Sequence, residues 1–175
     1  KIFFSGFAAV INAMRLAPKF VIARVQGKAV GGGVGLACAA DYTLAHEGAS
    51  VKLSELAVGI GPFVVGPAVE RKIGSSAFSS LSINASEWQS ASWAREKGMY
   101  VDTFTSLTEL DQAINSLASK LAGSNPEAMK ALKRVFWSNT DHWDKLLIER
   151  AEISGKLVLS DFTRSAIAKF KAGTR

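Results

Sequence analysis

The groups in this sequence best suited to chemistry are a run of glycines and a glutamate that follows it. Three consecutive glycines, 31–33, come after an apolar segment at 20–25 and before small residues expected to be helical at 34–40. Glycines at a strand-to-helix junction let the backbone approach a ligand closely and leave the first helical N–H groups uncovered. Such N–H groups, at the positive end of a helix dipole, suit an oxygen that gains negative charge during a reaction. The run therefore indicates a backbone site for an oxyanion.

Other glycine-rich junctions have requirements that this one does not meet. A Walker A phosphate loop needs Lys-Ser/Thr after its last glycine, and neither follows Gly35. The dinucleotide-binding pattern separates its glycines, whereas Gly31, Gly32 and Gly33 are contiguous. Close packing of a helix on a strand, with no ligand, remains the structural alternative.

Glu55 is the second candidate. Its segment, Lys52-Leu53-Ser54-Glu55, overlaps a short apolar strand expected at 51–53. As a general base, a glutamate here could remove a proton from a substrate and return it elsewhere. The alternative is structural, because a carboxylate near the start of a helix is stabilised by the helix dipole.

A close resemblance to the crotonase family, the enoyl-CoA hydratases and isomerases, runs from Pro18 to Pro62. That stretch reads PKFVIARVQGKAVGGGVGLACAADYTLAHEGASVKLSELAVGIGP, with a strand, Gly-Gly-Gly, a helix, Cys/Ala-Asp and a downstream Glu in the family's order. The resemblance continues through Ala91-x-x-Ala94-x-x-x-Gly98-Met99 into the C-terminal helices. It covers essentially the whole chain, which is similar to the C-terminal two-thirds of a family domain.

The resemblance implies an α/β fold of the ClpP/crotonase type, a spiral of ββα units followed by a C-terminal helical region. Residues 1–123 would be a partial crotonase-like core and residues 124–175 the helical region that forms a homotrimer or hexamer. The N-terminal part of the family domain, with most of the strands and a second oxyanion donor, is expected to precede this chain as a missing portion of the same protein.

The resemblance also assigns roles to individual residues. The Gly32 N–H would hold a thioester oxygen and Glu55 would transfer the proton, on an acyl-CoA substrate that needs no other cofactor and no metal. Further substrate contacts are expected from Gly31, Gly33, Gly35, Pro62 and Phe63, and weak contacts to the coenzyme A phosphates from Lys169 and Lys171.

Two departures from the family pattern bear on the reaction. Family hydratases have a second glutamate where this sequence has Gly35, and Phe63 replaces a small residue of their Pro-Gly-x-Gly-Gly loop. A single carboxylate resembles the family's isomerases, yet so close a pattern also suits a hydratase. The sequence therefore predicts hydration or double-bond isomerisation of an enoyl-CoA, and leaves open a non-catalytic acyl-CoA-binding or scaffolding role.

Composition limits the other function classes. The 175 residues suffice for one domain with a sizeable core, and the net charge of +6 is spread along expected helices. We therefore expect no nucleic-acid partner and no membrane partner. The single cysteine, Cys38, is expected in the core, which fits a cytoplasmic protein, and His46 and His142 match no metal-ligand spacing.

Periodicity and capping signals predict the remaining elements. Helices are expected at 2–17, 64–73, 86–97 and 107–122, after Asn125-Pro126, from a cap at Asp141 to about 159, and from Asp161 onward. Buried strands are expected at 20–25 and 42–45.

Overall fold

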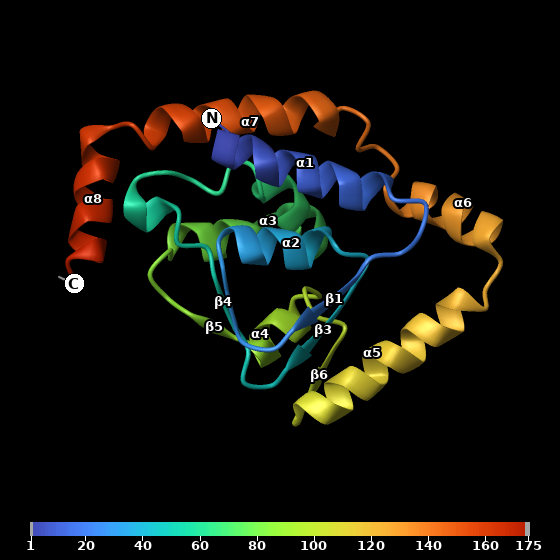
Figure 1. Ribbon diagram of the computed structural model, residues 1–175. Helices are drawn as coiled ribbons and strands as arrows, with labels where there is room; N and C mark the ends of the chain where they lie inside the picture. Colours follow the sequence, from blue (N-terminus) through green and yellow to red (C-terminus); the bar gives the residue numbers. More distant parts are fainter. Residues whose placement is uncertain (1, 174–175) are drawn as a thin grey trace.

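The computed structural model describes residues 2–173, without the side chains of Ile2, Phe170 and Lys171. Helices form the top and both sides of the molecule, and short strands lie toward its base (Figure 1). The helices are α1 (Ile2–Leu16), α2 (Gly32–Ala39), η1 (Leu56–Val58), α3 (Gly66–Ile83), α4 (Ala91–Glu96), α5 (Leu107–Ala122), α6 (Pro126–Phe136), α7 (Trp143–Leu157) and α8 (Asp161–Lys171). The strands are β1 (Ile22–Val25), β2 (Lys28–Val30), β3 (Tyr42–His46), β4 (Ser50–Lys52), β5 (Gln89–Ser90) and β6 (Asp102–Phe104).

The strands make two small sheets. In one, the order is β1-β3-β6 and both pairs are parallel; in the other, the order is β2-β4-β5, with β2 and β4 parallel and β5 antiparallel. Helix α2 connects β2, in the second sheet, to β3, in the first sheet. The register pairs Val30 with Lys52, which brings the segments after β2 and β4 side by side.

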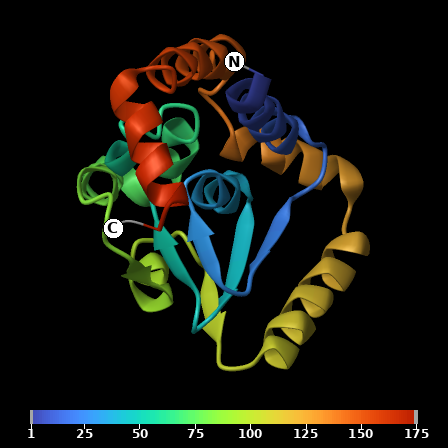
Figure 2. The ribbon, with the colours of Figure 1, turned by 60° about the vertical axis from the view of Figure 1, so that its left-hand side comes forward.

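Helix α2 is the centre of the fold. Its small residues allow close approach on all sides, and Val34, Gly35, Ala37, Cys38 and Ala39 are buried. It contacts α3, α1 and the strands β1 and β2. In the turned view α2 is seen nearly end-on, with the strands below it and α1 and α7 above (Figure 2). Burial raises the pKa of the Cys38 thiol to about 12, so Cys38 is the inert core residue that the sequence predicts.

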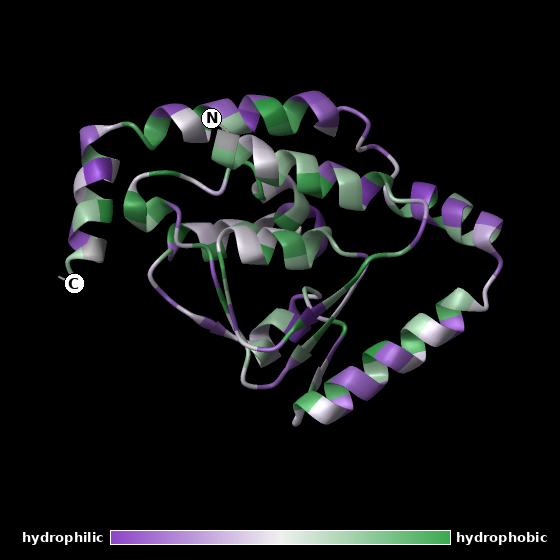
Figure 3. Cartoon of the chain, viewed as in Figure 1, coloured by the Kyte–Doolittle hydropathy of each residue, from purple (hydrophilic) through white to green (hydrophobic). Residues whose placement is uncertain are grey.

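Charged groups fix two of the helical contacts. Arg15, 4% exposed, lies 2.6 Å from Asp144, which ties α1 to α7. Asp41, after α2, accepts hydrogen bonds from Val21 N–H, Trp137 Nε1–H and the buried Lys133 ammonium, so α6 is attached to the core by a paired charge. Helix α2 is apolar along its length, whereas α5 and α6 alternate polar and apolar residues (Figure 3).

Several expected elements are confirmed with small shifts. The helix expected at 2–17 is α1, which ends at Leu16, and the helix expected at 107–122 matches α5. Asn125 caps α6 with its side chain, and α8 begins at Asp161. The helix expected at 64–73 continues to Ile83 through a kink at Gly74 (φ 79, ψ 161), so the expected end coincides with the kink.

Other expectations are wrong. The segment 20–25 is not a fully buried strand: β1 begins at Ile22, lies at a sheet edge and leaves Arg24 exposed. The segment 86–97 holds β5 and the short α4 because the Ser90 side chain caps a helix there. Asp141 is not a cap, since His142 occupies that position without a side-chain bond. Strands β2 and β6 were not expected. None of the helices described is long and apolar enough to cross a membrane.

Candidate active site

The glycine run forms the turn between β2 and α2. Gly31 has a φ of +52°, donates its N–H to Lys52 O at 2.9 Å and accepts the Gly35 N–H at 3.1 Å. A Cβ at position 31 would lie 2.8 Å from Oε1 of Glu55. Both the backbone conformation and the close approach of the carboxyl group therefore require glycine here.

The head of α2 lies beside that carboxyl group. Because Gly31 caps the helix, the N–H groups of Gly32, Gly33 and Val34 have no carbonyl four residues earlier within α2. Gly31, Gly32 and Gly33 all line the same pocket. The predicted backbone donor, Gly32, and the predicted base, Glu55, thus line the same pocket.

A second turn holds Glu55. It follows β4 and caps η1, and its carbonyl accepts the N–H groups of Val58 at 3.2 Å and Ile60 at 2.9 Å. Gly59 closes the turn with a φ of +80°. These bonds fix the backbone of Glu55 independently of its side chain.

The Glu55 carboxyl group is desolvated. Its Oε2 is buried and has no hydrogen-bond partner among the described residues. Burial raises the pKa of Glu55 above its ordinary value, an effect partly offset by a hydrogen bond to its own backbone. A carboxyl group in this state exchanges a proton closer to neutral pH than an exposed one does.

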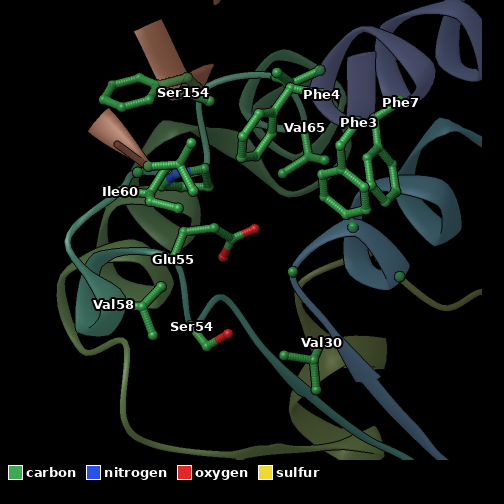
Figure 4. Close-up of a pocket in the computed structure, with 18 of the residues that line it drawn as sticks. Phe3, Phe4, Phe7, Val30, Ser54, Glu55, Val58, Ile60, Val65 and Ser154 are labelled. Carbon is green, nitrogen blue, oxygen red and sulfur yellow. The ribbon is translucent and has the colours of Figure 1, made fainter. Parts of the chain in front are cut away.

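Glu55 reaches into a pocket of about 600 Å³, with Phe3 and Phe7 facing it and Val58 and Ile60 on its own side (Figure 4). The lining is otherwise apolar or small, and Glu55 is its one ionisable side chain among the described residues. The lining residues are Phe3, Phe4, Phe7, Val30, Gly31, Gly32, Gly33, Ser54, Glu55, Val58, Ile60, Gly61, Pro62, Phe63, Val64, Val65, Ser154, Val158 and Ile167.

Helix α1 supplies an aromatic wall that the sequence reasoning missed. The Phe3 ring meets those of Phe4 and Phe7 edge-on, with centroids 5.3 and 5.4 Å apart. A Cβ at Gly32 would lie 2.3 Å from the Phe7 ring, so Phe7 is pressed against the helix head. The spacing of these phenylalanines on one helix face was the available signal.

Gly35 lies outside the pocket lining. It is buried, and a Cβ there would come within 2.4 Å of Val65 Cγ1. Val65, rather than Phe63, fills the space next to it. Pro62 and Phe63 do line the pocket, and both also line a smaller cavity of about 290 Å³ beside α3.

Neither Lys169 nor the two histidines line the pocket. Lys169 is exposed on α8, and the side chain of Lys171 falls outside the described residues. His46 contacts Thr105 O and the Gly48 N–H, away from Glu55. Across residues 2–173 no group of His, Cys, Asp or Glu side chains is arranged to hold a metal ion.

Residues 2–169 match the family model described as enoyl-CoA hydratase/isomerase. A curated relative, the carnitinyl-CoA dehydratase of Salmonella heidelberg, is 35% identical over 136 residues, which are 78% of this chain and 51% of the relative. The chain thus spans about half the length of the curated relatives it matches.

Solved structures show the same fold. An enoyl-CoA hydratase from Mycobacterium avium superposes with a TM-score of 0.88 at 25% identity, covering 97% of this chain and 66% of its own. One from Shewanella pealeana gives a TM-score of 0.71 at 27% identity, covering 97% of this chain and 63% of its own. These matches confirm the α/β crotonase-like fold.

Proposed function

The chain belongs to the enoyl-CoA hydratase/isomerase family, and we propose that it acts on acyl-CoA thioesters by moving a proton with Glu55. One observation carries the proposal. The Glu55 carboxyl group, whose Oε2 has no hydrogen-bond partner in the part of the chain that the structure describes, lies in an apolar pocket beside the N-terminus of α2. A base and a set of backbone donors therefore border the same space, as proton abstraction next to a thioester requires.

The Gly32 amide is the proposed oxyanion donor. Removing a proton α to a thioester carbonyl builds negative charge on the carbonyl oxygen. A backbone N–H already fixed at a helix head stabilises that charge without reorganising, and one such donor contributes roughly 2.7–4 kcal/mol. Gly31 cannot do this, because its N–H already binds Lys52 O.

Glu55 is the proposed base. Burial raises its pKa, which strengthens the carboxylate as a base, and proton transfer is most efficient when the base pKa lies near the working pH. With no other ionisable group in the described lining, the same carboxyl group both takes up and returns the proton.

We infer that double-bond isomerisation is the favoured reaction. Hydration needs a second group to position water and supply a proton, and Gly35 offers none. Val65 packs where a side chain at position 35 would project. Hydration or dehydration is the second candidate, favoured by the names of the relatives, a carnitinyl-CoA dehydratase and an enoyl-CoA hydratase. Loss of the second carboxylate also favours a non-catalytic acyl-CoA-binding role.

We further propose a homotrimer or hexamer assembled through residues 124–175. Support comes from large apolar side chains that α6 and α7 leave exposed, namely Leu132, Val135, Phe136, Ile148 and Ile153. Sedimentation of the protein tests this directly.

The experiment for the function is Glu55→Gln. This change keeps the shape of the side chain and removes the base, so turnover of enoyl-CoA should fall by roughly 100-fold or more. Binding of a saturated acyl-CoA should stay similar. Near-normal turnover would remove Glu55 from the mechanism, and binding without turnover in the unmodified protein would favour the non-catalytic role.

A further inference from the structure

Helix α8 packs against the turn that carries Glu55. In Figure 1, α8 runs beside the short teal helix η1. The contact is polar at its centre, because the Thr163 Oγ1 hydroxyl donates to Gly59 O at 3.2 Å. Thr163 is 0% exposed, so this bond is shielded from water.

The start of α8 orients the Thr163 hydroxyl. Ser160 Oγ donates to Thr163 Oγ1 at 3.1 Å and accepts the Thr163 N–H at 3.3 Å. The Thr163 hydroxyl therefore accepts a hydrogen bond from Ser160 and donates one to Gly59 O, and hydrogen bonds linked in this way strengthen each other. Ser160, at the start of α8, thus orients the Thr163 hydroxyl proton toward Gly59 O.

The backbone at Gly59 touches α8 directly. A Cβ there would lie 2.4 Å from the Phe162 ring and 2.7 Å from Thr163 Oγ1. Gly59 also ends η1, and the amides on either side of it, at Val58 and Ile60, donate to the carbonyl of Glu55. Gly59 is thus connected to Glu55 through the hydrogen bonds of one turn.

We propose that Thr163 is a positioning residue, whose hydrogen bond to Gly59 holds the Glu55 carboxyl group at the head of α2. This inference rests on the proposed role of Glu55. Helix α8 also lines the pocket through Ile167, and the end of α7 does so through Ser154 and Val158. Helix α8 thereby contacts both the turn that carries the base and, through Ile167, the wall of the pocket.

Three variants test the proposal. Thr163→Val deletes the hydroxyl and keeps the shape, and Thr163→Ser restores the hydroxyl. The matched control is Thr43→Val, since Thr43 is also 0% exposed and donates to a backbone carbonyl, Ala37 O, at 2.7 Å, but it lies on β3 and is not among the residues that line the pocket. Thermal unfolding should show comparable losses of stability in Thr163→Val and Thr43→Val.

The readouts separate positioning from stability. With an enoyl-CoA substrate, Thr163→Val should lower kcat about 5- to 10-fold with little change in the Kd of a saturated acyl-CoA, and Thr163→Ser should recover most of kcat. Thr43→Val should leave kcat unchanged. Equal kcat in Thr163→Val and Thr43→Val would overturn the proposal.

Hydrogen exchange provides a test that does not depend on turnover. Exchange of the Val58, Gly59 and Ile60 amides should quicken about fivefold or more in Thr163→Val and remain unchanged in Thr43→Val. Unaltered exchange at these amides would refute the tie between α8 and the turn. If the turn loosens while the unmodified protein turns over no enoyl-CoA, the proposed function fails and the structural tie stands.

Discussion

The substitution Gly32→Ala tests whether the N-terminus of α2 takes part in catalysis or only in packing. A Cβ at Gly32 would lie 2.3 Å from Cε1 and Cζ of Phe7, so either the ring or the first turn of α2 must move. Gly33 is the matched position, because the nearest atom to a Cβ there is the Ala29 Cβ at an ordinary 3.7 Å. Both glycines lie in the first turn of α2, so the helix propensity gained is similar at each.

The two changes differ in expected magnitude. Alanine in place of glycine gains about 0.8–1.0 kcal/mol of helix propensity. At Gly32, overpacking against Phe7 costs about 1–3 kcal/mol, so the net change in the free energy of unfolding is a loss of about 0–2 kcal/mol. At Gly33 only the gain remains. A displaced Gly32 amide should lower kcat by about 10²–10³, the effect of losing one oxyanion donor.

Urea unfolding and steady-state turnover of an enoyl-CoA measure the two effects separately. Adding Phe7→Leu to Gly32→Ala makes room for the Cβ and should recover much of kcat. Gly32→Ala with kcat within about twofold of the unmodified protein would refute the assignment of the oxyanion donor to this amide.

Three further outcomes are expected. Phe63→Ala should join the cavities of about 600 and 290 Å³ and shift kcat/KM toward longer acyl chains, and an unchanged chain-length profile would contradict this. Gly35→Glu should destabilise the protein through its contact with Val65, whereas Gly35→Glu with Val65→Gly should raise the hydration rate; no gain in that pair would count against the role given to position 35. Burial raises the pKa of Glu55 above 4.5, so native protein binds this proton more tightly than unfolded protein and loses stability as pH rises through the native pKa. Glutamine does not titrate, so Glu55→Gln does not lose this stability as pH rises. The free energy of unfolding of Glu55→Gln minus that of the unmodified protein should therefore be larger at pH 8 than at pH 4. A difference that does not change with pH would be inconsistent with a buried carboxyl group.

Local signals explain what the sequence predicted well. The cap at Asn125 with Pro126, and the capping box from Ser106 to Glu109, involve residues a few positions apart, and both helices start where expected. The glycine turn is equally local, because the φ of +52° at Gly31 favours glycine whatever surrounds it. Whether Gly32 and Glu55 act in catalysis stays a prediction.

Long-range packing explains what the sequence did not predict. Val65 covers Gly35 and Phe7 covers Gly32, and neither contact leaves a trace in the spacing along the chain. Thr163 meets Gly59 only because α8 folds back across η1. The strands β2 and β6, with three residues each, form by pairing with β4 and β3 and carry no periodicity of their own.

The most direct test of the account compares two reactions of the unmodified protein on thioesters of one chain length. Isomerisation is followed from a 3-enoyl-CoA and hydration from the matching 2-enoyl-CoA, and kcat/KM is measured for each. Because Glu55 is the one carboxyl group in the described pocket lining, isomerisation should be the faster reaction. Hydration that exceeds isomerisation would contradict proton transfer by a single carboxylate.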